Sequence, residues 1–109
     1  MSTLKIQIVE DEIVIADSIY DTLEELGYQP LEPVINYTEA LAQARDESPD
    51  LALLDVQLAG KKDGIDLAQV YREEFDFPFI FLTSNAESET LRRAKPLKPA
   101  AYLIKPFGK

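Results

Sequence analysis

Polar groups able to bind a cation, or to accept and hold a phosphoryl group, follow four short apolar runs of this chain. The runs span residues 4–9, 51–54, 79–82 and 101–104, and the turn residues that bound them predict strands. The groups that follow are, in chain order, Glu10 and Asp11, then Asp55, then Thr83 and Ser84, then Lys105. Because sites in open α/β sheets form beyond the carboxyl ends of the strands, we expect these side chains at one edge of one sheet.

This set of groups suits a metal-assisted transfer of a phosphoryl group to a carboxylate. A carboxylate and a phosphoryl group repel each other, and a divalent cation cancels that repulsion. Mg²⁺ takes oxygen ligands and keeps several waters, so the carboxylates of Glu10, Asp11 and Asp55 suffice to bind it. Lys105 can neutralise one phosphoryl oxygen, and Thr83 can donate a hydrogen bond to another. Aspartyl phosphate is an established intermediate of this chemistry.

Composition places the chain among ordinary globular domains. Its 109 residues are 46% apolar, which is enough for one domain with a single modest core. It has no cysteine and no histidine, which excludes disulfides, thiolate chemistry, Ser-His-Asp catalysis and histidine metal sites. No apolar run is long enough to span a bilayer, and no secretory signal is present, so we expect a cytoplasmic location without membrane binding.

Charge is divided unevenly along the chain. Residues 1–60 hold 13 acidic and 2 basic side chains, whereas residues 61–109 hold 7 acidic and 9 basic ones, for a net charge of −9. The basic C-terminal part is either a solvated surface or a docking face for an acidic partner. The overall acidity argues against direct nucleic-acid binding by this domain, because a nucleic-acid backbone requires clustered Lys and Arg.

Helical periodicity and turn residues predict the elements of the first half. Apolar residues recur at helical spacing over 16–26, and Gly27 is suited to end that helix in a left-handed conformation. Residues 31–35 predict a short edge strand, because the proline at position 33 cannot donate to a central ladder. Asn36, with a glutamate three residues later, predicts the capped start of a second helix that ends at residues 48–50.

The second half predicts two more helices. Apolar spacing indicates a third helix over 67–75 after a polar loop at 60–64, and a short fourth helix over 87–95, closed by prolines 96 and 99. The run 51–54 is apolar at every position, which is typical of a parallel strand covered on both faces. The order βαβαβαβαβ therefore predicts an α/β fold with a doubly wound parallel sheet.

After residue 107 only Gly108 and Lys109 remain, so the sequence has no segment for a helix following the fifth strand. We expect residues 1–109 to be a single domain whose last helix, and any output domain, are absent. One flank of the sheet would then be uncovered, which leaves open a homodimer or a non-native oligomer through that flank.

The chain resembles the receiver domain of two-component response regulators over essentially its whole length. The resemblance lies in four segments taken together and in this order: Ile8-Val9-Glu10-Asp11-Glu12, Leu53-Leu54-Asp55, Phe81-Leu82-Thr83-Ser84 and Tyr102-Leu103-Ile104-Lys105-Pro106-Phe107. It implies a flavodoxin-like fold with five strands in the order 2-1-3-4-5. It also implies a signalling switch that takes a phosphoryl group from a histidine kinase or a phosphotransfer protein.

Roles follow from the resemblance position by position. Asp55 matches the phosphoacceptor. Metal ligation would come from Glu10, Asp11, Asp55 and the backbone carbonyl of Gln57, with Mg²⁺ as the cofactor and Mn²⁺ as a substitute. The switch and phosphate-clasping positions are Thr83, Ser84, Tyr102 and Lys105, and the bond before Pro106 is expected to be cis. Such a domain would catalyse only its own phosphorylation and dephosphorylation.

The sequence departs from the family pattern at two positions, and three other functional interpretations compete with the receiver interpretation. Glu10 stands where Asp is also common, and Ala59 lies in a loop where many relatives carry a proline. A receiver-like docking module that works without phosphorylation is the alternative function. Nucleotide- or flavin-binding proteins would require glycine-rich loops that are absent here, and a haloacid-dehalogenase-like phosphatase would require an Asp at the position of Gln57.

Overall fold

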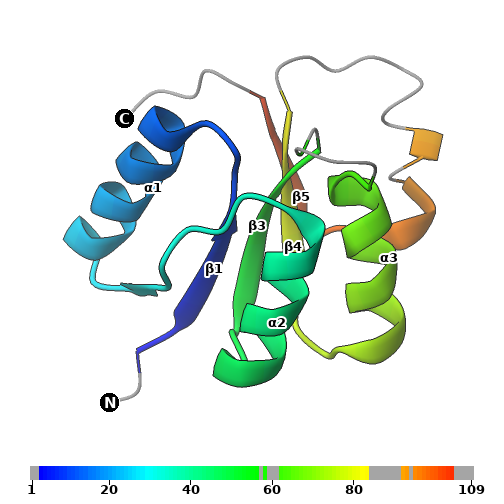
Figure 1. Cartoon of the computed structure of the whole chain (residues 1–109), viewed down its shortest axis with the longest axis horizontal. Helices are drawn as coiled ribbons and strands as arrows, with labels where there is room; N and C mark the ends of the chain where they lie inside the picture. The colour runs from blue at the N-terminus through cyan, green and yellow to red at the C-terminus, as the bar shows by residue number, and fades with distance from the viewer. Residues whose placement is uncertain (1–2, 57, 59–61, 84–91, 94, 105–109) are drawn as a thin grey trace.

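A five-stranded parallel sheet forms the centre of the computed structural model (Figure 1). The structure describes residues 3–56, 58, 62–83, 92–93 and 95–104. The strands lie in the order β2-β1-β3-β4-β5, as predicted. Their bounds are Lys5–Val9 for β1, Gln29–Pro30 for β2, Leu51–Asp55 for β3, Phe79–Thr83 for β4 and Ala101–Ile104 for β5.

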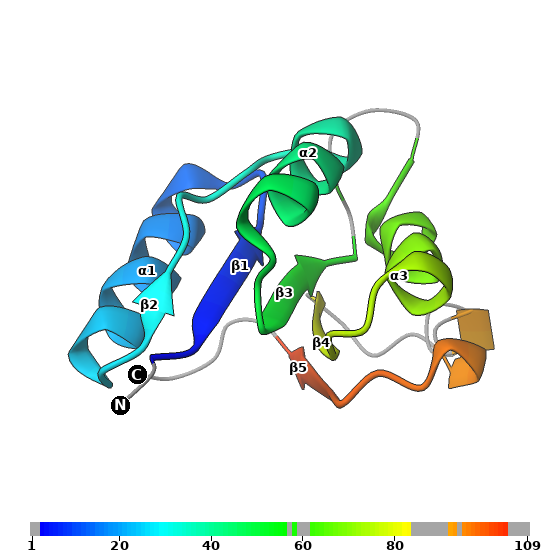
Figure 2. The same cartoon turned by 90° about the horizontal axis from the view of Figure 1, so that it is seen from below.

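Among the described residues, three α-helices cover the two faces of this sheet. Their bounds are Ile13–Glu25 for α1, Tyr37–Glu47 for α2 and Gly64–Glu74 for α3. Helix α1 packs against Ile6 and Ile8 on one face, and α2 and α3 pack against Val9 and Leu54 on the other. Figure 2 shows α1 apart from α2 and α3 in this arrangement. The prediction of a doubly wound, flavodoxin-like sheet is therefore confirmed.

Strand register brings the carboxyl ends of β1, β3 and β4 to one edge, the upper edge in Figure 1. Val9 lies opposite Leu54, and Asp55 lies opposite Leu82. The backbone N–H of Val56 donates to the Leu82 carbonyl at 3.0 Å, so the pairing of β3 with β4 continues past Asp55. Residues that directly follow β1 and those that end β3 and β4 are thus neighbours across the sheet.

Helix α1 ends as the sequence predicts but begins earlier. Gly27 has φ +93°, its N–H donates to the carbonyl of Glu24, and the N–H of Tyr28 donates to that of Leu23. These two bonds are the Schellman pattern of a glycine-ended helix. The helix starts at Ile13 rather than at residue 16. Apolar periodicity did not reveal this first turn, because Ile13 and Val14 are exposed and do not belong to the buried face.

The predicted edge strand over 31–35 is wrong in its position, since β2 comprises Gln29–Pro30. Hydrogen bonds to β1 do continue beyond β2. The N–H of Leu31 donates to the Ile6 carbonyl, and the N–H of Val34 donates to the Ile8 carbonyl. Pro30 and Pro33 have no N–H, so the ladder is broken into a two-residue strand and an isolated bridge between Val9 and Val34.

Side-chain caps fix the starts of α2 and α3. The N–H of Glu39 donates to Asn36 Oδ1 at 2.9 Å, as predicted, and the Glu39 carboxylate accepts from the N–H of Ile35. Helix α3 begins at Gly64, three residues before the predicted start. Asp63 and Asp66 form a reciprocal capping box that holds this extra turn.

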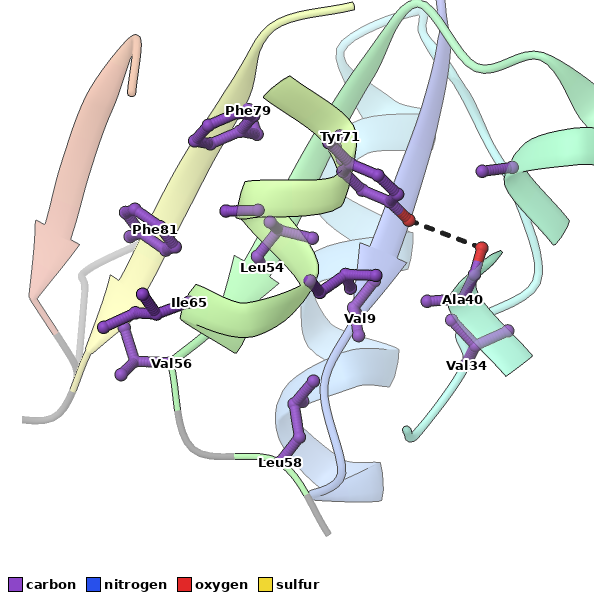
Figure 3. Packing of buried hydrophobic residues seen from close by; sticks show 14 residues of the cluster. Val9, Val34, Ala40, Leu54, Val56, Leu58, Ile65, Tyr71, Phe79 and Phe81 are labelled. Carbon is purple, nitrogen blue, oxygen red and sulfur yellow. Dashed lines mark hydrogen bonds between the residues drawn. The ribbon is translucent and has the colours of Figure 1, made fainter. Parts of the chain in front are cut away.

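The core on the α2–α3 face contains a polar group that the sequence pattern did not reveal. Gln7 of β1 is fully buried, and its Nε2 donates to the Ala40 carbonyl at 2.9 Å and to Gln43 Oε1 at 3.1 Å. The Tyr71 hydroxyl donates to Gln7 Oε1. It also lies 3.3 Å from the Ala40 carbonyl oxygen, the contact drawn in Figure 3. The network ties β1, α2 and α3 together.

The predicted fourth helix falls mostly outside the described residues. Arg92 and Arg93 are helical, and a 3-10 helix, η1, spans Lys95–Leu97 against α3. Pro96 lies within η1, where proline is tolerated because the first turn of a helix needs no N–H donor. The predicted bounds of the fourth helix stay a prediction. The predicted absence of a helix after β5 concerns positions outside the described residues.

Candidate functional site

Three carboxylates gather at the carboxyl edge of β1 and β3. Glu10, Asp11 and Asp55 each offer an oxygen, and these oxygens all lie within 4.8 Å of one another. Glu10 and Asp11 directly follow β1, and Asp55 is the last residue of β3. The prediction that these residues come together is confirmed. Parallel pairing causes it, since Val9 and Leu54 lie side by side one residue earlier.

The first member of the acidic pair is held inside the protein. Glu10 is fully buried, and its N–H donates to the Val34 carbonyl at 2.9 Å. Its Oε2 accepts a hydrogen bond from the N–H of Glu12 at 3.2 Å. Asp11, in contrast, is exposed. The pair therefore offers one carboxylate fixed by the chain around it and one that faces solvent.

Asp55 is almost completely buried, with 5% of its surface exposed. The first turn of α3 lies against its backbone, because an ideal Cβ on Gly64 would be 2.0 Å from the Asp55 carbonyl oxygen. The N–H of Gly64 donates to the Val56 carbonyl at 2.8 Å. A side chain at position 64 would therefore displace the backbone that carries Asp55.

Thr83 ends β4 and is buried, with 6% exposed. It lies opposite Ile104 in the register of β4 with β5, while Asp55 lies opposite Leu82, the residue before Thr83. The hydroxyl predicted to contact a phosphoryl group is thus at the same sheet edge as Asp55. Tyr102 lies in β5 opposite Phe81.

The remaining predicted site residues are not placed by the structure. Gln57, Ser84, Lys105 and Pro106 lie outside the described residues. Their predicted parts in metal binding and phosphate clasping, and the cis bond before Pro106, stay predictions.

The donor set fits a hard divalent cation. Mg²⁺ binds oxygen at about 2.0–2.1 Å in an octahedron, so oxygens sharing one ion are separated by about 3–4 Å. The spread of up to 4.8 Å among the three carboxylates is close to this requirement. Carboxylates without sulfur or imidazole ligands favour Mg²⁺, Ca²⁺ or Mn²⁺ over zinc or copper.

A comparison with known families decides what kind of domain this is. The model of the response regulator receiver domain matches residues 6–109. The chain belongs to this receiver family. Among curated relatives, the transcriptional regulatory protein PdtaR of Mycobacterium tuberculosis is 32% identical over 104 residues, covering 95% of this chain and 50% of that protein. The phosphate regulon regulator PhoB of Escherichia coli is 34% identical over 106 residues, covering 95% and 46%.

Solved receiver structures are similar to this domain in both fold and sequence. The signal receiver domain of a modulated diguanylate cyclase from Desulfovibrio desulfuricans G20, described as an example of alternate folding, has a TM-score of 0.91 and 38% identity; the match covers 98% of this chain and 85% of that one. A CheY-like receiver domain from Methanospirillum hungatei JF-1 has a TM-score of 0.87 and 30% identity, with the same coverage. The chain spans about half the length of the curated regulators it matches.

Sequence reasoning missed three residues beside this receiver site. Asp63 and Asp66 form the α3 capping box, and the Arg93 guanidinium reaches both carboxylates. The available signal was an acidic residue three positions after Asp63, at the start of an amphipathic helix.

No helix in the described part of the chain is long and apolar enough to cross a bilayer.

Proposed function

We propose that this receiver domain is a signalling switch activated by phosphorylation of Asp55. The observation that carries the proposal is the position of the Asp55 carboxylate, which ends β3 within 4.8 Å of the Glu10 and Asp11 oxygens. A buried acceptor beside two further carboxylates is suited to a reaction in which a cation offsets charge repulsion. The family supports two-component signalling in general terms, and the transfer to Asp55 is our proposal.

The proposed reaction is an in-line transfer from a phosphohistidine of a histidine kinase or phosphotransfer protein. An oxygen of the Asp55 carboxylate forms a bond to phosphorus, and the bond from phosphorus to the imidazole nitrogen breaks. The electron pair of that bond returns to the imidazole, which takes up a proton from solvent and leaves as the neutral base. The product is an acyl phosphate on Asp55, which later reacts with water. The domain supplies groups for its own modification and has no separate substrate.

Binding of Mg²⁺ is assigned to Asp11, Asp55 and the backbone carbonyl of Gln57, with Glu10 beside them. The bound ion would supply positive charge that offsets the repulsion between the carboxylate and the phosphoryl oxygens. The Glu10 carboxylate is fixed by the N–H of Glu12. We therefore assign Glu10 to holding the neighbouring Asp11 carboxylate in place. Mn²⁺ is expected to substitute, because it accepts the same oxygen ligands.

The response to phosphorylation is assigned to the ends of β4 and β5. A phosphoryl group adds roughly 1.5 to 2 negative charges near pH 7. We propose that the Thr83 hydroxyl and the Lys105 ammonium bind its oxygens, that Ser84 leaves room for this movement, and that Tyr102 changes position with Thr83. The change biases a partner-binding surface between two states.

Partners of the switch follow from this proposal. A histidine kinase or phosphotransfer protein supplies the phosphoryl group in the cytoplasm. The relatives PdtaR and PhoB are named as transcriptional regulators and are about twice as long as this chain. A longer parent chain would therefore carry an output domain, and we assign nucleic-acid contact, where present, to that domain.

The test is the intact mass of the protein after incubation with Mg²⁺ and acetyl phosphate. We expect one added phosphoryl group on the wild type, no addition on Asp55→Asn, and none when EDTA is added first. Asp50→Asn, a change at the opposite, amino-terminal end of β3, is the matched control and should still be modified. Absence of any adduct on a wild type shown to be folded would favour the alternative function, a docking module that works without phosphorylation.

A further inference from the structure

The start of α3 connects the Asp55 backbone to a segment that follows β4. Asp63 Oδ1 accepts hydrogen bonds from the N–H groups of Ile65 and Asp66, both at 3.0 Å. Asp66 Oδ2 accepts from the N–H of Asp63 at 2.9 Å. The two carboxylates thereby fix the first turn of α3, and the next residue after Asp63 is Gly64, whose backbone lies against the Asp55 carbonyl.

Arg93 joins this turn from a distant part of the sequence. Its Nη1 lies 3.0 Å from Asp63 Oδ2 and its Nη2 lies 3.4 Å from Asp63 Oδ1, so the contact is bidentate. Nη2 is also 3.8 Å from Asp66 Oδ1. Arg93 precedes η1, which lies against α3. Figure 1 shows this part of the chain beside α3.

We propose that Arg93 is a positioning residue for the first turn of α3 and, through Gly64, for the Asp55 backbone. Its ion pairs with Asp63 and Asp66 link the helical residues 92–93, which precede η1, to the backbone that holds Asp55. Binding at the Asp55 site and placement of that segment then influence each other, because coupling between two sites is reciprocal. This inference rests on the proposed function for its signalling consequence, and on the described contacts alone for its structural part.

The geometry of the link separates it from an ordinary surface ion pair. An exposed pair between two flexible side chains contributes little. Here Asp63 is 28% exposed and is already fixed by two backbone N–H groups, and the arginine contacts both of its oxygens. A planar guanidinium held by two carboxylates transmits position as well as charge, which a lysine would not do.

The path from Arg93 to the acceptor is short and has little freedom. Asp63 is covalently adjacent to Gly64, and the N–H of Gly64 donates to the Val56 carbonyl at 2.8 Å. A Cβ at position 64 would lie 2.0 Å from the Asp55 carbonyl oxygen, so the two backbones are in direct contact. A displacement of Asp63 by its ion pair would therefore shift the backbone of Asp55 or Val56.

The test measures binding of Mg²⁺, and of Mg²⁺ with beryllofluoride as a phosphoryl mimic, by isothermal titration calorimetry. The variants are Arg93→Gln, Asp63→Asn and the double variant, with Arg92→Gln as the control matched in charge and exposure. Asparagine keeps the oxygen that caps α3. We expect each single variant to weaken both affinities by about threefold to tenfold. The double variant should be no weaker than either single variant.

A purely electrostatic effect would give a different pattern. Arg93→Gln removes a positive charge and Asp63→Asn removes a negative one, so long-range charge alone would move Mg²⁺ affinity in opposite directions. It would also make Arg92→Gln resemble Arg93→Gln. Opposite signs, additive effects in the double variant, or equal effects of the two arginine variants would each overturn the proposal.

A second readout needs no ligand and separates failure of this proposal from failure of the proposed function. In amide NMR spectra of the unliganded protein, Arg93→Gln should shift the signals of Val56 and Gly64, and Arg92→Gln should leave them in place. If the shifts stop at Asp63 and Asp66, the link to Asp55 does not exist. If the wild type binds neither Mg²⁺ nor beryllofluoride, the proposed function fails and these shifts alone decide the role of Arg93.

Discussion

The backbone of Gly64 lies directly against the carbonyl oxygen of Asp55, so close that a Cβ at Gly64 would be 2.0 Å from that oxygen. Gly64→Ala should therefore force the α3 start away from β3, with a loss of about 1–3 kcal/mol in the free energy of unfolding. The displacement falls on Asp55, the proposed phosphoacceptor. We also expect slower phosphorylation by acetyl phosphate, measured on the folded fraction by intact mass.

Gly27 provides the control for this substitution. It has φ +93° and nothing within 4 Å of an ideal Cβ. Gly27→Ala should reduce the free energy of unfolding by about 1–2 kcal/mol through backbone strain, measured by urea denaturation, and should leave the phosphorylation rate unchanged. Equal rates for Gly64→Ala and Gly27→Ala would mean that the close approach at Asp55 has no effect on the chemistry.

Tyr71→Phe should destabilise the domain although it removes a single oxygen. The Tyr71 hydroxyl donates to Gln7 Oε1, and both residues are fully buried. Removing it leaves a buried amide oxygen without this donor, at a cost of about 1–3 kcal/mol. Urea denaturation measures the loss. Tyr28→Phe, at a position 41% exposed, is the control and should be within about 0.5 kcal/mol of the wild type.

Alkaline stability should also depend on Tyr71. Burial raises the pKa of the Tyr71 hydroxyl above its ordinary value of 10.0. A raised folded-state pKa gives a contribution that is complete below pH 10 and is lost as the pH rises toward the folded-state value. Unfolding free energies measured from pH 8 to pH 11 should fall for the wild type and fall less for Tyr71→Phe. Parallel curves would contradict this assignment.

Asp63 should contribute stability that disappears in acid. Burial raises the pKa of Asp63, but the Asp66 N–H and the Arg93 guanidinium favour the charged form more strongly, so the pKa lies below its ordinary value of 3.8. The contribution is present above 3.8 and is lost as the pH falls through the lower folded-state value. Wild type and Asp63→Asn should therefore converge in stability below pH 3.8. A difference that stays constant with pH would exclude this linkage.

Mg²⁺ should stabilise the folded domain through the three-carboxylate cluster. A ligand that binds only the folded state adds about 2.7 kcal/mol at a concentration of 100 Kd. Asp11→Asn should remove most of this gain, and it should stabilise the metal-free protein because it relieves repulsion among carboxylates within 4.8 Å. Thermal unfolding with Mg²⁺ and with EDTA measures both effects. Asp17→Asn, at an exposed position of α1, should change neither.

Residues whose role depends on strand ends could be predicted from the sequence. Glu10, Asp11 and Asp55 follow apolar runs, and parallel pairing places the ends of such runs together whatever lies between them. The start of α2 at Asn36 and the end of α1 at Gly27 were predictable for a similar reason, since each depends on local backbone chemistry alone.

Contacts that depend on tertiary packing could not be predicted. Gln7 lies within an apolar run, and nothing local indicates that Tyr71 and Ala40 would satisfy its amide in the core. The link between Arg93 and Asp63 joins residues 30 positions apart through an arrangement of α3 and η1 that the periodicity does not specify. The strand β2 was misplaced because two prolines interrupt its ladder, and hydropathy does not record which N–H groups remain available.

The pairing of β1 with β3 also determines when in folding the carboxylate site comes into existence. Lys5 and Asp50 are 45 residues apart and hydrogen-bonded at the start of this pair, and Glu10 and Asp55 have the same separation at its end. Contacts between residues so far apart in the sequence raise the contact order of the fold. The chain must close a long loop before these contacts can form. A nascent chain that has emerged only through α2 has no cation site. The three-carboxylate cluster therefore marks formation of the central β1–β3 pair, before β4 and β5 are added to the sheet.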